Sequence, residues 1–139
     1  MLGEIFAIIS AIFWGVAPIL DRYALSTGVP MYLALAIRAS GALFAMLIIA
    51  ILLRETNLTI RLDALASLLI AGAIGGAIAM IFYYRALEMI GASRTVPITA
   101  IYPMFTALFS FIFLSESITP KTIAGIVFIV IGVILVSEM

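Results

Sequence analysis

The sequence has no cysteine and no histidine among its 139 residues, and only 10% of its residues are charged. The absence of cysteine excludes a disulfide framework and a thiolate metal site. The absence of histidine removes the commonest general base, metal ligand and proton relay. Lys plus Arg and Asp plus Glu number seven each, so no basic face for nucleic acid is indicated. We therefore expect no catalytic residues, no metal, no cofactor and no nucleic-acid partner.

Hydrophobic residues, in contrast, make up 66% of the chain, and the mean hydropathy is +1.37. So short a chain cannot hide that much apolar surface in a soluble core. A membrane helix needs about 20 apolar residues. The pattern predicts an all-α integral membrane protein in which residues 1–139 form a single five-helix domain. The predicted helices cover residues 3–25, 30–53, 62–85, 94–115 and 120–138.

The ends of these segments have their own signals. The first segment is predicted to be a span rather than a signal peptide, because it lacks a positively charged start and a small-residue cleavage site. Gly28 and Pro30 separate the first two helices. Thr119 followed by Pro120 is typical of an N-cap with proline at the first helical position. The connectors leave no room for a separate soluble domain.

Arg38 lies about 12 Å into the second predicted helix, by the helical rise. A charge at the centre of a membrane helix costs roughly 2.5–3.5 kcal/mol on insertion scales, so an internal partner or a water-filled cavity is expected. Asp21 ends the polar face of the first segment on the same side of the membrane, and we predict an Asp21–Arg38 pair. The alternative is that Asp21 pairs with Arg22 at the surface, while Arg38 contacts only backbone carbonyls and water.

Hydroxyl side chains recur along the fourth segment at helical spacing: Thr95, Thr99, Tyr102, Thr106 and Ser110. Pro97 and Pro103 loosen the same helix. Irregular helices are tolerated in membranes where they line a cavity or are buried in protein. The stripe therefore predicts a substrate path, and the alternative is ordinary packing with hydroxyls bonded to carbonyls of their own helix.

Two other segments add path candidates. Ser10, Trp14 and Asp21 share a face of the first segment, where Trp14 could stack against a substrate. In the third segment Tyr83 lies on a face with glycines, although it could instead belong to the interfacial aromatic belt. The glycine pairs Gly72–Gly76 and Gly125–Gly132 are predicted to be packing or dimer contacts.

These residues resemble a known family. "AIFWGVAPILDRYAL" is similar to the first helix of EamA domains, and Arg38 matches an arginine that these domains carry in their second helix. The stretch from Tyr83 to Leu135 resembles the second part, with Tyr-x-x-Ala-Leu, Ala-Ser-Arg, Pro103 and a glutamate, Glu116, before Thr-Pro. The usual glycine before that glutamate is Ser115 here, and the usual aromatic after the arginine is Ala39.

This resemblance implies the drug/metabolite transporter superfamily and a secondary transporter of small organic molecules, often an exporter. Most members have ten helices built from two inverted five-helix repeats, and this chain resembles one repeat. The last segment, "GIVFIVIGV", also resembles the dimer-forming helix of small multidrug resistance proteins. We expect an alternating-access transporter in the cell (plasma or inner) membrane, with the lipid bilayer and a small-molecule substrate as partners. A membrane assembly or regulatory subunit without transport activity is the alternative, and an enzyme is not expected.

The loop charges bear on assembly. One side of the membrane receives Arg54, Arg61 and Lys121, and the other receives Arg22, Arg85 and Arg94. Orientation follows the Lys and Arg bias of short loops, and here the bias is zero. This balance predicts dual insertion and an antiparallel homodimer. Insertion in one orientation, or a heterodimer with a related five-helix subunit of opposite orientation, is the alternative.

Overall fold

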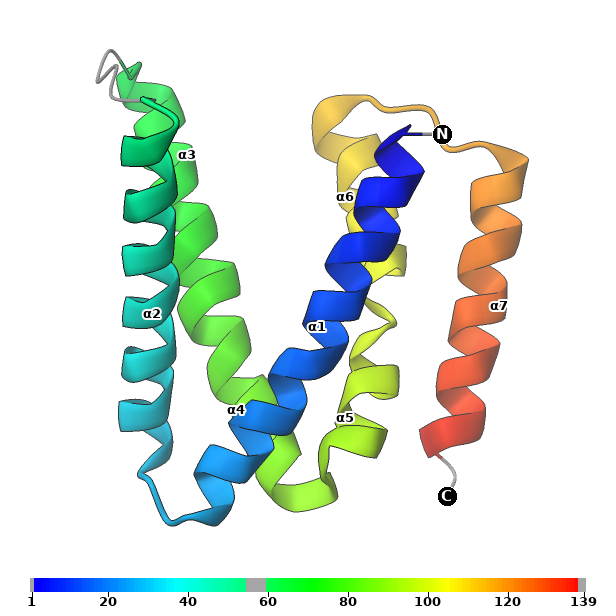
Figure 1. The fold of residues 1–139 in the computed structure, drawn as a ribbon. Coiled ribbons are helices and arrows are strands. Elements are labelled where there is room, and N and C mark those ends of the chain that lie inside the picture. Colours follow the sequence, from blue (N-terminus) through cyan, green and yellow to red (C-terminus); the bar gives the residue numbers. More distant parts are fainter. Residues whose placement is uncertain (1, 55–59, 138–139) are drawn as a thin grey trace. The chain divides into compact units, whose positions relative to one another are not determined.

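The computed structural model of the chain describes residues 2–54 and 60–137. These residues form helices in the order α1 (Leu2–Ser26), α2 (Met31–Leu52), α3 (Leu62–Ala71), the π-helix η1 (Gly72–Ile78), α4 (Ala79–Ile90), α5 (Ala92–Thr99), α6 (Tyr102–Leu114) and α7 (Pro120–Ser137) (Figure 1). Five of the resulting helical segments are long and apolar enough to cross a membrane. The predicted all-α, five-span membrane fold is therefore confirmed.

The fold consists of two compact units. One contains the residues up to Ile19 and those from Met89 on, and the other is Leu20–Glu88. The first unit contains the packing of α5 against α7. The second brings together the end of α1, α2 and the continuous helix α3–η1–α4. The grouping of all five spans into one domain stays a prediction.

The third span, Leu62–Ile90, runs five residues beyond its predicted end at residue 85. Arg85 and Glu88 form an ion pair one turn apart, with Nη1 and Oε2 separated by 3.2 Å. Gly91, at φ +74°, then breaks the helix. Because glycine accepts a left-handed conformation without steric cost, one residue suffices as the connector. The longer connector expected over residues 85–94 is therefore wrong, and the next helix begins at Ala92.

The fourth span is interrupted between α5 and α6. Ala100 and Ile101 make short-range hydrogen bonds to the carbonyls of Pro97 and Ile98, at 3.1 and 3.3 Å. Pro103 has no backbone N–H, so the Thr99 carbonyl loses its usual helical donor. The interruption confirms that the prolines loosen this helix.

Local capping signals are also found in the structure. Thr119 Oγ1 accepts a hydrogen bond from the Thr122 backbone N–H at 3.2 Å, and Pro120 is the first residue of α7. Gly28 adopts φ +87° between α1 and α2. These contacts confirm the predicted N-cap and the predicted helix break.

Few side chains are fully buried. Tyr84 and Leu87 are enclosed in the second unit, and Thr95 is enclosed in the first. Most large apolar side chains of the described residues are exposed. In water such a surface would drive aggregation, whereas in a bilayer it faces acyl chains of the same polarity. This surface therefore fits a multi-pass membrane protein.

Candidate functional site

A polar cluster in the second unit centres on Asp21, near the end of α1. The Tyr84 hydroxyl donates a hydrogen bond to Asp21 Oδ1 at 2.7 Å. Arg38 Nε lies 3.4 Å from the same oxygen. The other carboxylate oxygen, Oδ2, is buried and has no hydrogen-bond partner among the described residues. The structure therefore brings the predicted Asp21–Arg38 pair together and leaves half of the carboxylate unsatisfied.

The two members of this pair differ in exposure. The Asp21 side chain is 11% exposed, whereas the Arg38 side chain is 42% exposed. Arg38 borders a cavity of about 350 Å³, whose other lining residues are Leu35, Ala39, Ala42 and Gly76. Apart from Leu35, these residues have a methyl group or no side chain, so they leave space beside the guanidinium. Arg38 thus has the expected internal partner and also borders a cavity.

Arg22, the alternative partner of Asp21, is engaged elsewhere. Its Nη1 donates to the carbonyls of Leu87 and Glu88, at 2.8 and 3.2 Å. Both carbonyls belong to the last turn of α4, where helix carbonyls lack intrahelical donors and the helix dipole favours a cation. Arg22 therefore fastens α1 to α4, which leaves Asp21 available to Arg38 and Tyr84.

The three residues of the cluster lie at similar distances from the ends of their helices. Asp21 is five residues before the end of α1, Arg38 is seven residues after the start of α2, and Tyr84 is six residues before the end of α4. At the helical rise these positions are about 8, 11 and 9 Å from their helix ends. The three ends belong to the same side of a five-span topology, so the three side chains reach matching depths.

Tyr84 was missed by sequence reasoning, which selected its neighbour Tyr83. Tyr83 is half-buried, and its ring centroid lies 6.4 Å from that of Tyr84. The prediction assumed a regular α-helix from Gly72 onward, but Gly72–Ile78 is a π-helix. Because π turns hold more residues than α turns, later side chains are displaced by about one position. The glycine-rich run was the available signal for this irregularity.

The remaining path candidates lie in the first unit. Ser10 Oγ donates to the Ala7 carbonyl at 3.1 Å, and Trp14 is 75% exposed. In the fourth span, Thr99 and Thr106 donate to carbonyls of their own helices, those of Val96 and Tyr102, at 2.8 and 3.2 Å. For these two hydroxyls, such bonds agree with the alternative interpretation, in which the hydroxyls bond carbonyls of their own helix and take part in ordinary helix packing. A role in a substrate path stays a prediction for all four residues.

Two residues at the start of α5 carry unsatisfied polar atoms. Thr95 is 1% exposed, and its Oγ1 has no partner among the described residues. Arg94 donates from Nη2 to the carbonyl of Ser137, the last residue of α7, at 3.2 Å, while its Nε is buried and has no hydrogen-bond partner in the described part of the chain. Arg94 thus fastens the end of α7 as Arg22 fastens the end of α4. Thr95 is enclosed in the described conformation, whereas Tyr102, the other stripe candidate, is 63% exposed.

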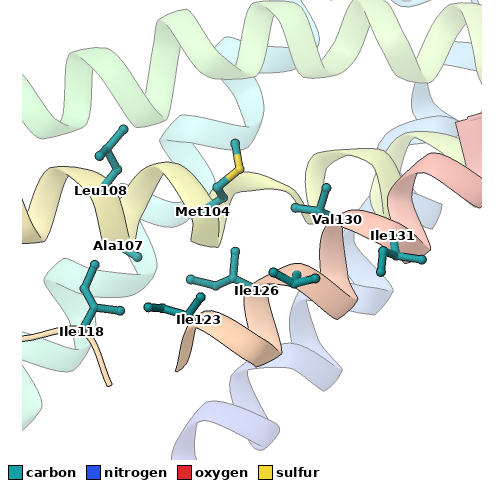
Figure 2. Close-up of a pocket in the computed structure, with 9 residues that line it drawn as sticks. Met104, Ala107, Leu108, Ile118, Ile123, Ile126, Val130 and Ile131 are labelled. Carbon is teal, nitrogen blue, oxygen red and sulfur yellow. The ribbon is translucent and has the colours of Figure 1, made fainter. Parts of the chain in front are cut away.

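A second hollow, of about 420 Å³, lies along α6 and α7 in the first unit. Figure 2 shows lining side chains of α6, of α7 and of the connector that precedes α7. The lining residues are Met104, Ala107, Leu108, Ile118, Ile123, Ile126, Val127, Val130 and Ile131. The hollow has no charged or hydroxyl group to orient a polar substrate. The cavity beside Arg38 is therefore the better candidate site.

Residues 1–138 match the EamA-like transporter family. The chain belongs to this family. A relative from Methanocaldococcus jannaschii, named only as an uncharacterized protein, is 29% identical over 133 residues, which cover 96% of this chain and 94% of the relative. No solved structure gives a significant match to this chain.

Membership of the EamA-like transporter family fits the single five-helix repeat and indicates a membrane transporter-like function. The members of this family are transporters and not, typically, enzymes. The four glycines predicted as contacts are unoccupied within the chain: a Cβ added at Gly72, Gly76, Gly125 or Gly132 would meet no described atom within 4 Å. Their notches are thus available to another molecule, and their role in dimerisation stays a prediction.

Proposed function

We propose that this EamA-family protein is an alternating-access secondary transporter, or exporter, of small organic metabolites or drugs in the cell membrane. One observation carries the proposal. Asp21, Arg38 and Tyr84 form a polar cluster about 8 to 11 Å inside the spans, beside a cavity. Ionisable groups at such depth are expensive, and they usually mark substrate or ion pathways.

The transporting unit in this proposal is an antiparallel homodimer of five-helix chains. The support is the balanced loop charge and the open glycine notches of α7. A relative of nearly the same length, 94% of which is covered, is consistent with a five-helix chain as the unit. Two oppositely inserted copies would supply the inverted repeats on which alternating access depends.

The test has two stages. A thermal-shift screen of metabolites first identifies ligands, because a ligand that binds the native state raises its apparent stability. Flux of the best ligand is then measured in proteoliposomes for the wild type, Arg38→Gln and, as a matched control, Arg85→Gln. We expect saturable flux in the wild type and the control, and about a tenfold or greater loss with Arg38→Gln.

Two results would contradict the proposal. Ligand binding without flux in either direction, under any imposed gradient, would favour an assembly or regulatory subunit. Equal flux in both arginine variants would show that the path does not pass Arg38.

A further inference from the structure

The Asp21–Arg38 pair is incomplete on both sides. Arg38 approaches Asp21 through Nε at 3.4 Å, longer than the 2.7–2.9 Å of a strong charge-assisted hydrogen bond. No partner for its Nη1 or Nη2 is present among the described residues. Asp21 accepts one short bond, from Tyr84, at Oδ1, while Oδ2 is buried and unpartnered. A half-satisfied buried network is costly, which indicates that a component is missing.

The cavity beside Arg38 suits one particular class of ligand. Arginine presents a planar fork that binds a carboxylate through two parallel hydrogen bonds. The other lining residues, Leu35, Ala39, Ala42 and Gly76, are aliphatic or lack a side chain. A volume of about 350 Å³ is near the lower end of the range for small-molecule sites. The site thus combines one cationic fork with a small apolar compartment.

We propose that Arg38 binds the carboxylate of a small apolar monocarboxylate in this cavity, and that Asp21 takes up one proton as the anion binds. This inference rests on the proposed transport function and names its substrate class and coupling. The carboxylate would accept hydrogen bonds from Nη1 and Nη2 of Arg38. The proton would come from the aqueous side and bind to Oδ2 of Asp21.

The reason is charge balance. The empty site holds Arg38⁺ and Asp21⁻, with no net charge. An added anion would leave a net charge of −1 inside the membrane, where unbalanced charge is expensive. Protonation of Asp21 returns the net charge of the site to zero. Its Oδ2 is buried and accepts no hydrogen bond from the described residues, so it can take the proton. The anion and the proton would therefore bind together and cross together.

Few other titratable groups face Asp21. From α2 there is Arg38, and from α4 there are Tyr84, bonded to the carboxylate, and Tyr83, against the ring of Tyr84. Arg22, next to Asp21 on α1, is held by the carbonyls of Leu87 and Glu88. Glu88 itself pairs with Arg85. Asp21 is therefore the carboxylate placed to accept the proton.

The experiment uses the whole purified protein in detergent, with butyrate as the probe. Calorimetry in two buffers of different ionisation enthalpy reports the number of protons taken up per butyrate bound. We expect close to one proton per butyrate, and an affinity that falls as the pH rises, by up to about tenfold for each pH unit over the range in which one proton is taken up. Binding without proton uptake would overturn the coupling. Preference for a hydrophobic cation such as tetraphenylphosphonium would overturn the substrate class.

Variants separate the two roles. Asp21→Asn should bind butyrate with an affinity independent of pH and without proton uptake. Arg38→Gln should weaken binding at least tenfold, and Arg38→Lys, which keeps the charge but not the fork, should weaken it less and retain proton uptake. Arg85→Gln is the matched control and should bind like the wild type. Unchanged butyrate binding in both Arg38 variants would overturn the proposal that the Arg38 guanidinium binds the carboxylate.

The outcome is independent of the transport test. Proton-linked butyrate binding without flux of any ligand would refute the transport function but leave the site as assigned. Flux of another ligand, with no butyrate binding at any pH, would refute this inference alone.

Discussion

Ser115 ends α6 in a left-handed conformation, with φ +55°. A side chain in this region clashes with the following carbonyl oxygen, which costs about 1–2 kcal/mol. EamA domains resembling this chain often have glycine here, and the backbone supplies the reason: glycine has no Cβ to clash. The departure of this sequence from the family pattern is therefore a local source of strain.

Ser115→Gly should stabilise the protein by about 1 kcal/mol, because it removes that clash. Ser110→Gly is the matched control in the interior of the same helix, where glycine forms helix less well than serine and should destabilise by about 0.5 kcal/mol instead. Thermal unfolding in mild detergent measures both. A lower melting temperature for Ser115→Gly would show that the side chain makes a contact worth more than the strain.

At the same scale, the Asp21–Arg38 pair should couple energetically. Arg38→Ala leaves the buried Asp21 without its cation, and we expect a loss of about 1–3 kcal/mol, less than for a fully buried pair because Arg38 is 42% exposed. The double variant Asp21→Ala, Arg38→Ala should recover part of this loss. A double-mutant cycle on unfolding free energies makes the comparison.

The control cycle uses Arg61 and Asp63, whose bidentate pair is 84% and 66% exposed. Its coupling should stay below about 0.5 kcal/mol, since water screens exposed pairs. Strictly additive losses at Asp21 and Arg38 would show that the pair contributes nothing to stability.

At the scale of elements, α7 has two different faces. Ile126, Val130 and Val133 are at least partly covered by the rest of the first unit, and Val133 is 8% exposed. Gly125 and Gly132 are exposed seven residues apart, on the same side of the helix. Small residues at this spacing allow the close backbone approach that drives helix association in membranes.

Gly125→Leu combined with Gly132→Leu should therefore fill the notches and abolish the dimer without unfolding the chain. The control is Ala124→Leu, which adds similar bulk one position away from that face. Cross-linking or light scattering in mild detergent gives the dimer content. A dimer content equal to that of the wild type would place the interface on another helix.

The π-helix is the second feature at this scale. Its extra residues decide that Tyr84, and not Tyr83, reaches Asp21 from α4. The open cavity beside Gly76 lies along the same segment. The irregular part of the third span thus coincides with the candidate site, as is frequent for π-bulges.

At the scale of the whole molecule, the loop charges predict dual insertion. Arg22 and Arg94 each bond carbonyls at a helix end, so two of the three cations on one side also have structural roles. The bias between the sides remains zero, because orientation depends on the number of Lys and Arg residues near the spans.

C-terminal reporters, one active only inside the cell and one only outside, should both give a signal. Adding one lysine next to Lys121 should then move the mixed signal toward the orientation in which that side is cytoplasmic, and a lysine next to Arg94 should move it the other way. Activity from one reporter alone would rule out the antiparallel homodimer.

The five spans, the broken fourth helix and the N-cap at Thr119 could be predicted from the sequence alone. Each depends on apolar length, proline or a local hydrogen bond, all of which act over a few neighbouring residues. Composition and motif order were likewise sufficient for the family. The depth of Arg38 and Asp21 was enough to predict their pairing, because an isolated charge in a membrane is so costly.

The groups that complete the site depend on contacts between helices, which the sequence does not specify. From the sequence alone, Arg22 could pair with Asp21. In the structure Arg22 instead bonds the carbonyls of Leu87 and Glu88 at the end of α4. Tyr84, and not the predicted Tyr83, bonds Asp21, because the π-helix rotates the side chains that follow it about the helix axis. The cavity at Arg38 arises because small residues of α2 and η1 meet there, and the sequence spacing within one helix does not specify what a neighbouring helix places opposite it.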